Sequence, residues 1–340
     1  MNEKWKEAST EGKYQHLKSL HCYYPRLKVL IGKLESCHNQ PKWKKDPECL
    51  FIKGIAGVGK STLIRIYASR HPRRQTEEGM IIPVLTASAP VPATIRGLAS
   101  RILKEMGDPA YDIGTTNKLS ARLHYLIKEC GVELIVLDEF QHFLDSESYK
   151  PSLNAANWIK ELINETGIPV VLIGMPSSEC IFYSRDQHQL SRRFKSRTSL
   201  DPFSWDNPST IKEFRSFLKM LNDELPLPES SYLHSTDTAF RIFYSTDGIL
   251  DHIMTLVKSA CGLAIERSLL QINHDLLAES FSEHIKPVLG WKKNPFRDSV
   301  ANLKEIDVDY QPVLPPNAPK SASKEKNKKN NNVKTLLSAQ

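Results

Sequence analysis

The sequence predicts an α/β protein with a parallel sheet covered by helices on both faces, followed by a small helical domain. Short apolar runs alternate with helical patterns between residues 49 and 174. These runs are almost continuously apolar, as expected of strands buried on both faces. From about Asn207, helical patterns follow one another without strands between them.

Four strands can be placed in this pattern. They are Cys49–Lys53, Met80–Thr86, Glu133–Asp138 and Ile168–Gly174. Pro83 weakens the second, because proline cannot donate a hydrogen bond to a sheet. The expected helices are Tyr24–Cys37, Ser61–Ser69, Ala93–Met106, Lys118–Cys130, Leu153–Thr166, Ser209–Asn222, Thr236–Tyr244, Ile249–Arg267 and His274–Ile285.

Composition and charge set broad limits. The 340 residues carry 46 Lys+Arg and 39 Asp+Glu, and 40% are hydrophobic, as in a folded protein. The basic excess lies at the two ends, in residues 1–45 and 319–340. We expect a basic helical segment (1–45), an α/β domain (46–206), a helical domain (207–285) and an extended, largely disordered basic tail (286–340).

Nothing in the sequence predicts a membrane segment or a disulfide scaffold. The longest apolar runs, Leu134–Leu137 and Ile168–Met175, are far too short to span a bilayer. The first ten residues lack the apolar core of a signal peptide. The six cysteines are scattered and have no zinc-ligand spacing. We therefore expect reduced thiols and a cytoplasmic protein.

The strongest motif is GIAGVGKS at residues 54–61, which fits the phosphate-binding pattern G-x-x-x-x-G-K-[ST] between a strand and a helix. Glycines allow successive backbone N–H groups to point at phosphate oxygens, and the helix that follows presents its positive end. We expect Lys60 to reach the β- and γ-phosphates and Ser61 to ligate Mg²⁺. The predicted nucleotide-binding residues are Gly54, Ile55, Ala56, Gly57, Val58, Gly59, Lys60, Ser61, Thr62 and Asp138.

A second motif places two acids at the end of an apolar strand, Asp138 and Glu139. Asp138 is expected to hold the Mg²⁺ shell with Ser61. Glu139 is the candidate general base that polarises the attacking water. One candidate strand lies between the two motifs, which is typical of ATPases with a catalytic glutamate. No NKxD motif follows, so ATP is favoured over GTP.

Weaker signals come from basic and hydroxyl side chains. Arg192 and Arg193 could reach the γ-phosphate on a neighbouring subunit. The candidate DNA contacts are Thr94, Arg96, Arg101, Thr115, Thr116 and Lys118, since hydroxyls and cations on loops suit phosphates. For every one of these residues, an ordinary solvated surface is the alternative interpretation.

Taken together, GIAGVGKSTL, VLTASAPVP, LIVLDEFQHFLD, IPVVLIGMP and QLSRRF resemble the TnsC/TniB family of AAA+ ATPase regulators of DNA transposition, which also serve CRISPR-associated transposons. The resemblance covers about residues 23–281. It implies an AAA+ P-loop NTPase with a five-stranded parallel sheet and a C-terminal helical lid. ATP and Mg²⁺ would bind between protomers, with Glu139 and Lys60 in cis and Arg193 as the finger in trans. Arg192 is the fallback for that finger.

The resemblance also implies partners. The chain would assemble on double-stranded DNA as a hexameric or heptameric ring or as a helical filament. The assembly would link a TniQ-type target selector, with or without a CRISPR effector, to transposase subunits of the TnsA/TnsB type. Hydrolysis would drive disassembly, and the basic C-terminal tail suits docking to the transposase. The setting would be the bacterial cytoplasm.

Two departures from the family pattern predict slow hydrolysis. Met175 stands where relatives often carry Thr, with Ser177 as a substitute, and His252 stands where an Arg is usual. Three alternatives stay open. They are a helicase loader of the DnaC/IstB type acting on single-stranded DNA, a STAND-like signalling ATPase, and a binding protein that uses ATP as structural glue.

Overall fold

The computed structural model describes residues 3–20, 23–41, 46–143, 150–183, 188–289 and 293–297. The described residues belong to one unit of the chain. Residues 298–340 lie outside the described residues, and with them most of the predicted basic tail.

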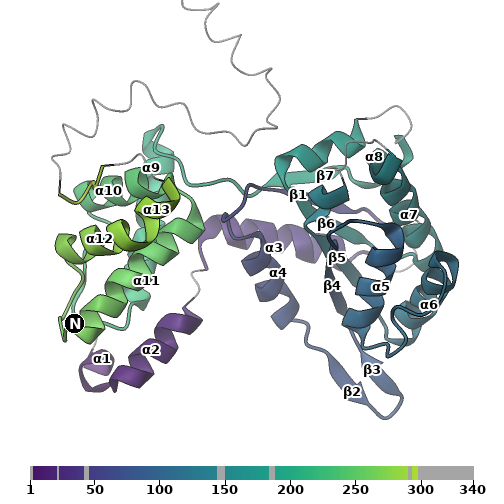
Figure 1. Ribbon diagram of the computed structural model, residues 1–340, viewed down its shortest axis with the longest axis horizontal. Coiled ribbons are helices and arrows are strands. Elements are labelled where there is room, and N and C mark those ends of the chain that lie inside the picture. The colour runs from purple at the N-terminus through teal and green to yellow at the C-terminus, as the bar shows by residue number, and fades with distance from the viewer. Residues whose placement is uncertain are drawn as a thin grey trace, which may run out of the picture. The chain divides into compact units, whose positions relative to one another are not determined.

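A five-stranded parallel sheet forms the centre of the α/β part (Figure 1). The strands run in the order β4 (Val84–Ser88), β5 (Leu134–Asp138), β6 (Val170–Gly174), β1 (Leu50–Lys53) and β7 (Ser196–Ser199), and each neighbouring pair is parallel. This confirms the predicted sheet. Because the strands are parallel, the carboxyl ends of β1, β5 and β6 meet at the same edge.

Strand side chains alternate between two cores. Leu50 and Ile52 face the core that holds α3 (Pro25–His38) and α4 (Lys60–Ser69). Phe51 faces the opposite core, against α5 (Ile95–Met106), α6 (Thr116–Glu129) and α7 (Lys150–Thr166). Figure 1 shows these two groups of helices on opposite sides of the sheet. Burial on both faces explains why the strands read as continuous apolar runs.

The expected strand Met80–Thr86 is wrong in its extent. Residues Gly79–Ile81 form β3, which pairs antiparallel with β2 (Arg74–Thr76) in a separate hairpin. Pro83 divides the run because it has no N–H for a ladder, although its carbonyl accepts the N–H of Leu134 at 3.0 Å. The fifth strand, β7, has the polar sequence SRTS and gave no apolar signal.

The helical part contains α9 (Pro208–Glu224), α10 (Thr236–Thr246), α11 (Leu250–Glu266) and α12 (His274–Ser280). A π-helical turn, Phe281–Ile285, continues the last of them into α13 (Lys286–Leu289). Helix therefore extends past residue 285, where the tail was expected to begin. Among the described residues no single helix is long and apolar enough to cross a membrane, although α10 and α11 pass that test as a pair bent by 119°.

The N-terminal segment is helical, as expected, and packs on the helical part. Its helices are α1 (Glu3–Glu7), α2 (Thr10–Ser19) and α3. Tyr14 Oη donates to the carbonyl of Gly262 at 3.2 Å. Arg26 Nη2 lies 2.7 Å from Oε2 of Glu213 on α9. These contacts place α2 and the start of α3 beside the helical part.

Candidate active site

The phosphate-binding loop follows β1 and ends at the first residue of α4. Gly59 has φ +100°, a left-handed conformation that suits glycine, and directly precedes the helix. Lys60 is buried, and its Nζ donates to the carbonyls of Gly54 and Ile55 at 2.9 Å each. Burial lowers the pKa of Lys60, and the carboxylates of Glu139 and Asp138 oppose that shift. The ammonium is therefore held inside the loop that it is predicted to serve.

Ser61 and Asp138 come together as predicted. Ser61 Oγ donates to Oδ2 of Asp138 at 3.4 Å, which joins the start of α4 to the end of β5. Burial raises the pKa of Asp138, while the N–H of Glu139, which donates to Oδ1 at 2.8 Å, acts in the opposite direction. A hydroxyl and a carboxylate side by side at the end of a phosphate-binding loop fit Mg²⁺, which prefers oxygen ligands. These two residues would hold the ion and its waters against the nucleotide phosphates.

Glu139 occupies a backbone conformation that few non-glycine residues adopt. Its φ is +56°, and the residue joins β5 to the 3₁₀ turn η1 (Phe140–Phe143). Gln141 Nε2 donates to Oε2 of Glu139, and His142 Nε2 lies 3.7 Å from the same oxygen. The backbone conformation and these side-chain contacts fix where the carboxylate points.

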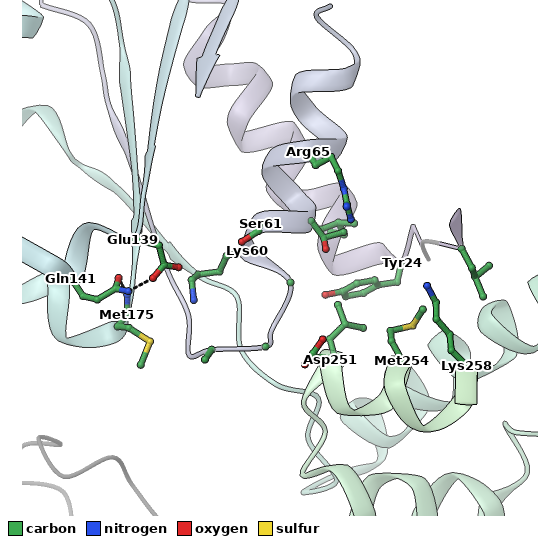
Figure 2. Close-up of a pocket in the computed structure, with 17 residues that line it drawn as sticks. Tyr24, Lys60, Ser61, Arg65, Glu139, Gln141, Met175, Asp251, Met254 and Lys258 are labelled. Carbon is green, nitrogen blue, oxygen red and sulfur yellow. Dashed lines mark hydrogen bonds between the residues drawn. The ribbon is translucent and has the colours of Figure 1, made fainter. Parts of the chain in front are cut away.

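A cavity of about 450 Å³ lies beside these groups, between the loop, α4 and α11 (Figure 2). Ala56, Gly57, Gly59, Lys60, Ser61, Thr62 and Glu139 line it. Gly54 and Ile55 instead support Lys60 through their carbonyls, Val58 is buried in the core, and Asp138 faces a neighbouring hollow behind Ser61. Some of the predicted nucleotide-binding residues thus line the cavity, and the others hold the lining residues in place or lie next to them.

The far side of the cavity is made of residues that the sequence did not single out. Tyr24, at the start of α3, packs against Phe203 and Phe217, with ring centroids 5.3 and 5.4 Å away. Burial raises the pKa of Tyr24 to about 12, so its hydroxyl stays protonated. Figure 2 shows the Tyr24 ring close to Asp251 and Met254 of α11, with Arg65 of α4 above it. This half-apolar wall is suited to a base and sugar.

The two departures from the family pattern have structural counterparts. Met175 lines the cavity, whereas Ser177 is exposed and is absent from its lining, so Ser177 does not supply the missing hydroxyl. In α11 it is Asp251 that lines the cavity, while His252 Nδ1 lies 3.4 Å from the carbonyl of Thr246. His252 is therefore not among the residues that line the cavity.

Arg193 lies at the opposite end of the sheet from the loop. Its carbonyl accepts the N–H of Cys49, the residue before β1, at 2.8 Å. Its Nη2 donates to Asp46 Oδ1 at 2.9 Å and to Asn164 Oδ1 at 2.5 Å. A hollow of about 560 Å³ at this end is also lined by Lys160, Arg192 and Lys195. Arg193 thus lies in a hollow whose basic residues outnumber its acidic ones, Asp46 and Glu48, and the exposed Arg192 lies beside it.

The predicted DNA contacts fall into two groups. Thr94 and Thr115 cap α5 and α6, and Arg96 Nη2 donates to the carbonyl of Asp112 at 2.7 Å. Arg96 therefore brings the start of α5 close to the loop before α6, and Thr116 and Lys118 lie in the first turn of α6 that follows this loop. Arg101 instead pairs with Glu105 at 3.3 Å and lines the hollow behind Ser61.

Comparison with known proteins adds the family. A family profile described as Bacterial TniB protein matches residues 14–204, more than half of the chain. The chain belongs to the TniB family. This match begins before the phosphate-binding loop and includes both acids and Arg193. No curated protein sequence is detectably similar to the chain.

Solved structures similar to this TniB-family chain share its fold at low sequence identity. The Aeropyrum pernix ORC2 protein, solved as ADPNP–ADP complexes, has a TM-score of 0.51 and 16% identity over 78% of this chain and 70% of its own. Cdc6p from Pyrobaculum aerophilum has a TM-score of 0.56 and 14% identity, over 80% and 72%. The Aeropyrum pernix ORC1 protein, solved with DNA, has a TM-score of 0.54 and 17% identity, over 76% and 64%. The fold is that of an AAA+ protein, and the chain is a P-loop ATPase.

Proposed function

We propose that this TniB-family ATPase assembles on double-stranded DNA in its ATP-bound form and regulates transposition there. The observation that carries the proposal is the separation of Arg193 from Lys60 within one chain. The loop follows the carboxyl end of β1, while Arg193 is bonded to the residue that precedes β1. A four-residue strand is about 13 Å long, so Arg193 is at the wrong end to serve its own nucleotide.

A second copy of the chain resolves this separation. Arg193 of one protomer would meet the γ-phosphate on the next, where a guanidinium stabilises charge in the transition state. Each ATP would then join two subunits, and hydrolysis would loosen the joint. Such head-to-tail contacts between subunits build a ring when the rotation from one subunit to the next closes, and a filament when it does not.

DNA contact is assigned to the surface formed by Thr94, Arg96, Thr115, Thr116 and Lys118. Each subunit would make a few phosphate contacts, and assembly would add them together. Such contacts carry no sequence information, so the target would be chosen by a partner. As in the family that the sequence resembles, we assign this role to a TniQ-type selector and give the transposase subunits the downstream side, in the bacterial cytoplasm.

The cavity is consistent with slow turnover. Asp251 rather than a cation faces it from the first turn of α11, and Met175 offers no polar side chain from the end of β6. We infer that the lack of a hydroxyl at residue 175 and of a cation in the first turn of α11 weakens the stabilisation of developing phosphate charge, with Arg65 and Lys258 as the other cations that line the cavity besides Lys60. ATP would then act as a timer for the assembly.

Glu139→Gln tests this proposal directly. The variant keeps the size of the side chain but removes the base, so it should bind ATP, assemble and stay on DNA. We expect its lifetime on double-stranded DNA in ATP to lengthen by about tenfold or more, in line with the contribution of a general base. An unchanged lifetime would contradict hydrolysis-driven release. A preference for single-stranded DNA would support a helicase loader instead.

A further inference from the structure

Gln141 joins Glu139 to the end of the neighbouring strand. The residue is 8% exposed and belongs to the 3₁₀ turn η1. Its Nε2 donates to Glu139 Oε2, and its Oε1 accepts the N–H of Met175 at 3.1 Å. Figure 2 shows this side chain between Met175 and Glu139, with the bond to the carboxylate drawn as a dashed line.

The orientation of the Gln141 amide follows from its partners. The backbone N–H of Met175 can only donate, so the amide oxygen must face it. The NH₂ group must then face Glu139, whose carboxylate can only accept when it is ionised. No other arrangement of the amide satisfies both neighbours, and a buried amide without partners would be costly.

The surrounding structure is shaped to hold this side chain. Phe140 and Phe143, on either side of Gln141, are 1% and 2% exposed and anchor the turn in the core. Gly174 ends β6, where a Cβ atom would lie 3.1 Å from Gln141 Oε1 and 2.6 Å from Ser178 Oγ. The lack of a side chain at residue 174 thus leaves room for the amide.

We propose that Gln141 is a positioning residue of the ATPase. It holds Oε2 of Glu139, so that the other oxygen, Oε1, is the one presented to the attacking water. The inference rests on the proposed role of Glu139 as the general base. In that step the water oxygen bonds to the γ-phosphorus, the bond from phosphorus to the β–γ bridging oxygen breaks, and the water proton passes to Oε1. ADP leaves with the electron pair of the broken bond.

Met175, which directly follows β6, is connected to Glu139 through Gln141. The polar group of residue 175 that takes part is its backbone N–H, which is bonded to Gln141 Oε1. The Gln141 amide therefore links the position of the Met175 backbone to the orientation of the Glu139 carboxylate. The sequence contains this residue within DEFQH, but spacing alone does not indicate its role.

The test compares single-turnover ATP hydrolysis by the full chain, with double-stranded DNA present, for wild type, Gln141→Leu and Gln141→Glu. The leucine side chain is similar in size to glutamine but makes neither hydrogen bond. Glu can no longer donate to an ionised Glu139. We expect both to lower the hydrolysis rate by about tenfold or more, with affinity for a slowly hydrolysed ATP analogue within about twofold of wild type. Gln75→Leu, on the exposed strand β2, is the matched control and should leave both quantities unchanged.

A positioning role makes a further demand that a merely structural role does not. In a Glu139→Gln background, Gln141→Leu should slow hydrolysis by less than about twofold, because the base through which it acts is gone. A wild-type rate in both Gln141 variants, or an equal further loss in the Glu139→Gln background, would overturn the inference. If Gln141→Leu fails to fold, Gln141→Glu carries the test. Full activity of Glu139→Gln alone would instead overturn the proposed base.

Discussion

The backbone N–H of Asp251 donates to the carbonyl of Gly57 at 2.9 Å, which bonds the first turn of α11 to the phosphate-binding loop. The backbone of Gly57 lies close to the start of α11. A Cβ atom on Gly57 would lie 2.9 Å from Ile249 Cγ2 and 3.2 Å from Asp251 Cβ. The loop and the helical part therefore form one nucleotide site, and a change in either should be felt in the other.

Gly57→Ala tests this contact. Gly57 has φ +77°, so alanine there costs about 1–2 kcal/mol in backbone energy, and its methyl group also presses on α11. We expect lower stability in urea unfolding and at least about tenfold weaker binding of an ATP analogue. Gly107→Ala is the matched control, because Gly107 has φ +87° with no atom within 4 Å of the added Cβ. Equal effects of the two variants on nucleotide affinity would contradict the contact.

Arg193→Ala should remove the group that links subunits. We expect DNA-stimulated hydrolysis to fall by about 10³-fold, the lower end of the range for arginine fingers, and ATP-dependent assembly to be lost. The measurements are phosphate release and light scattering with DNA. Arg267→Ala, which breaks an exposed pair with Glu279, is the control and should change neither. Loss of assembly in Arg192→Ala but not in Arg193→Ala would move the role to Arg192.

Lys118→Ala and Arg96→Ala test the DNA surface. Each removed phosphate contact should lower the slope of log affinity against log salt by about one, with no change in sequence preference. Arg101→Ala should leave the slope unchanged, because Arg101 pairs with Glu105. Titrations with fluorescent double-stranded DNA at several salt concentrations measure this. A larger effect for Arg101 than for Lys118 would place the DNA on the other side of α5.

His38 gives the fold a specific pH dependence. Burial, together with the charge of His71, holds the pKa of His38 below its ordinary value of 6.5, against the opposing effect of Glu133. His38 Nδ1 also lies 2.9 Å from the hydroxyl of Tyr67. Because the unfolded chain binds this proton more tightly, the contribution of His38 to stability is complete above pH 6.5 and is lost as the pH falls below it.

Replacing His38 should reduce that dependence. We expect the free energy of unfolding of His38→Gln to fall less than that of wild type between pH 7.5 and 5.5, the conditions on either side of an ordinary histidine pKa of about 6.5. Urea unfolding at both pH values gives the comparison. Parallel curves for the two proteins would show that His38 is not the group responsible.

The sequence predicted those parts of the protein that depend on local pattern. β5 and β6 are buried on both faces, so their composition alone identified them. The loop from Gly54 to Ser61 has a spacing set by phosphate geometry, and its position between a strand and a helix was confirmed. β7 was not predicted, because an edge strand with partly exposed residues needs no apolar run.

The remaining site residues depend on contacts between distant segments. Tyr24 reaches the cavity only because α3 packs against both the sheet and α9. Asp251 rather than His252 lines it because of the rotation of α11, which the packing of that helix sets. Gln141 acquires its geometry from the N–H of Met175, which is 34 residues away. No spacing rule within the chain encodes these relationships.

If ATP joins neighbouring chains on DNA through Arg193, assembly needs both the nucleotide and this residue. The most direct measurement is negative-stain electron microscopy of the purified protein with double-stranded DNA, with and without a slowly hydrolysed ATP analogue. We expect rings or filaments on DNA only with the nucleotide, and none in Arg193→Ala. Monomers under both conditions would contradict it, and so would assemblies that form equally well without nucleotide.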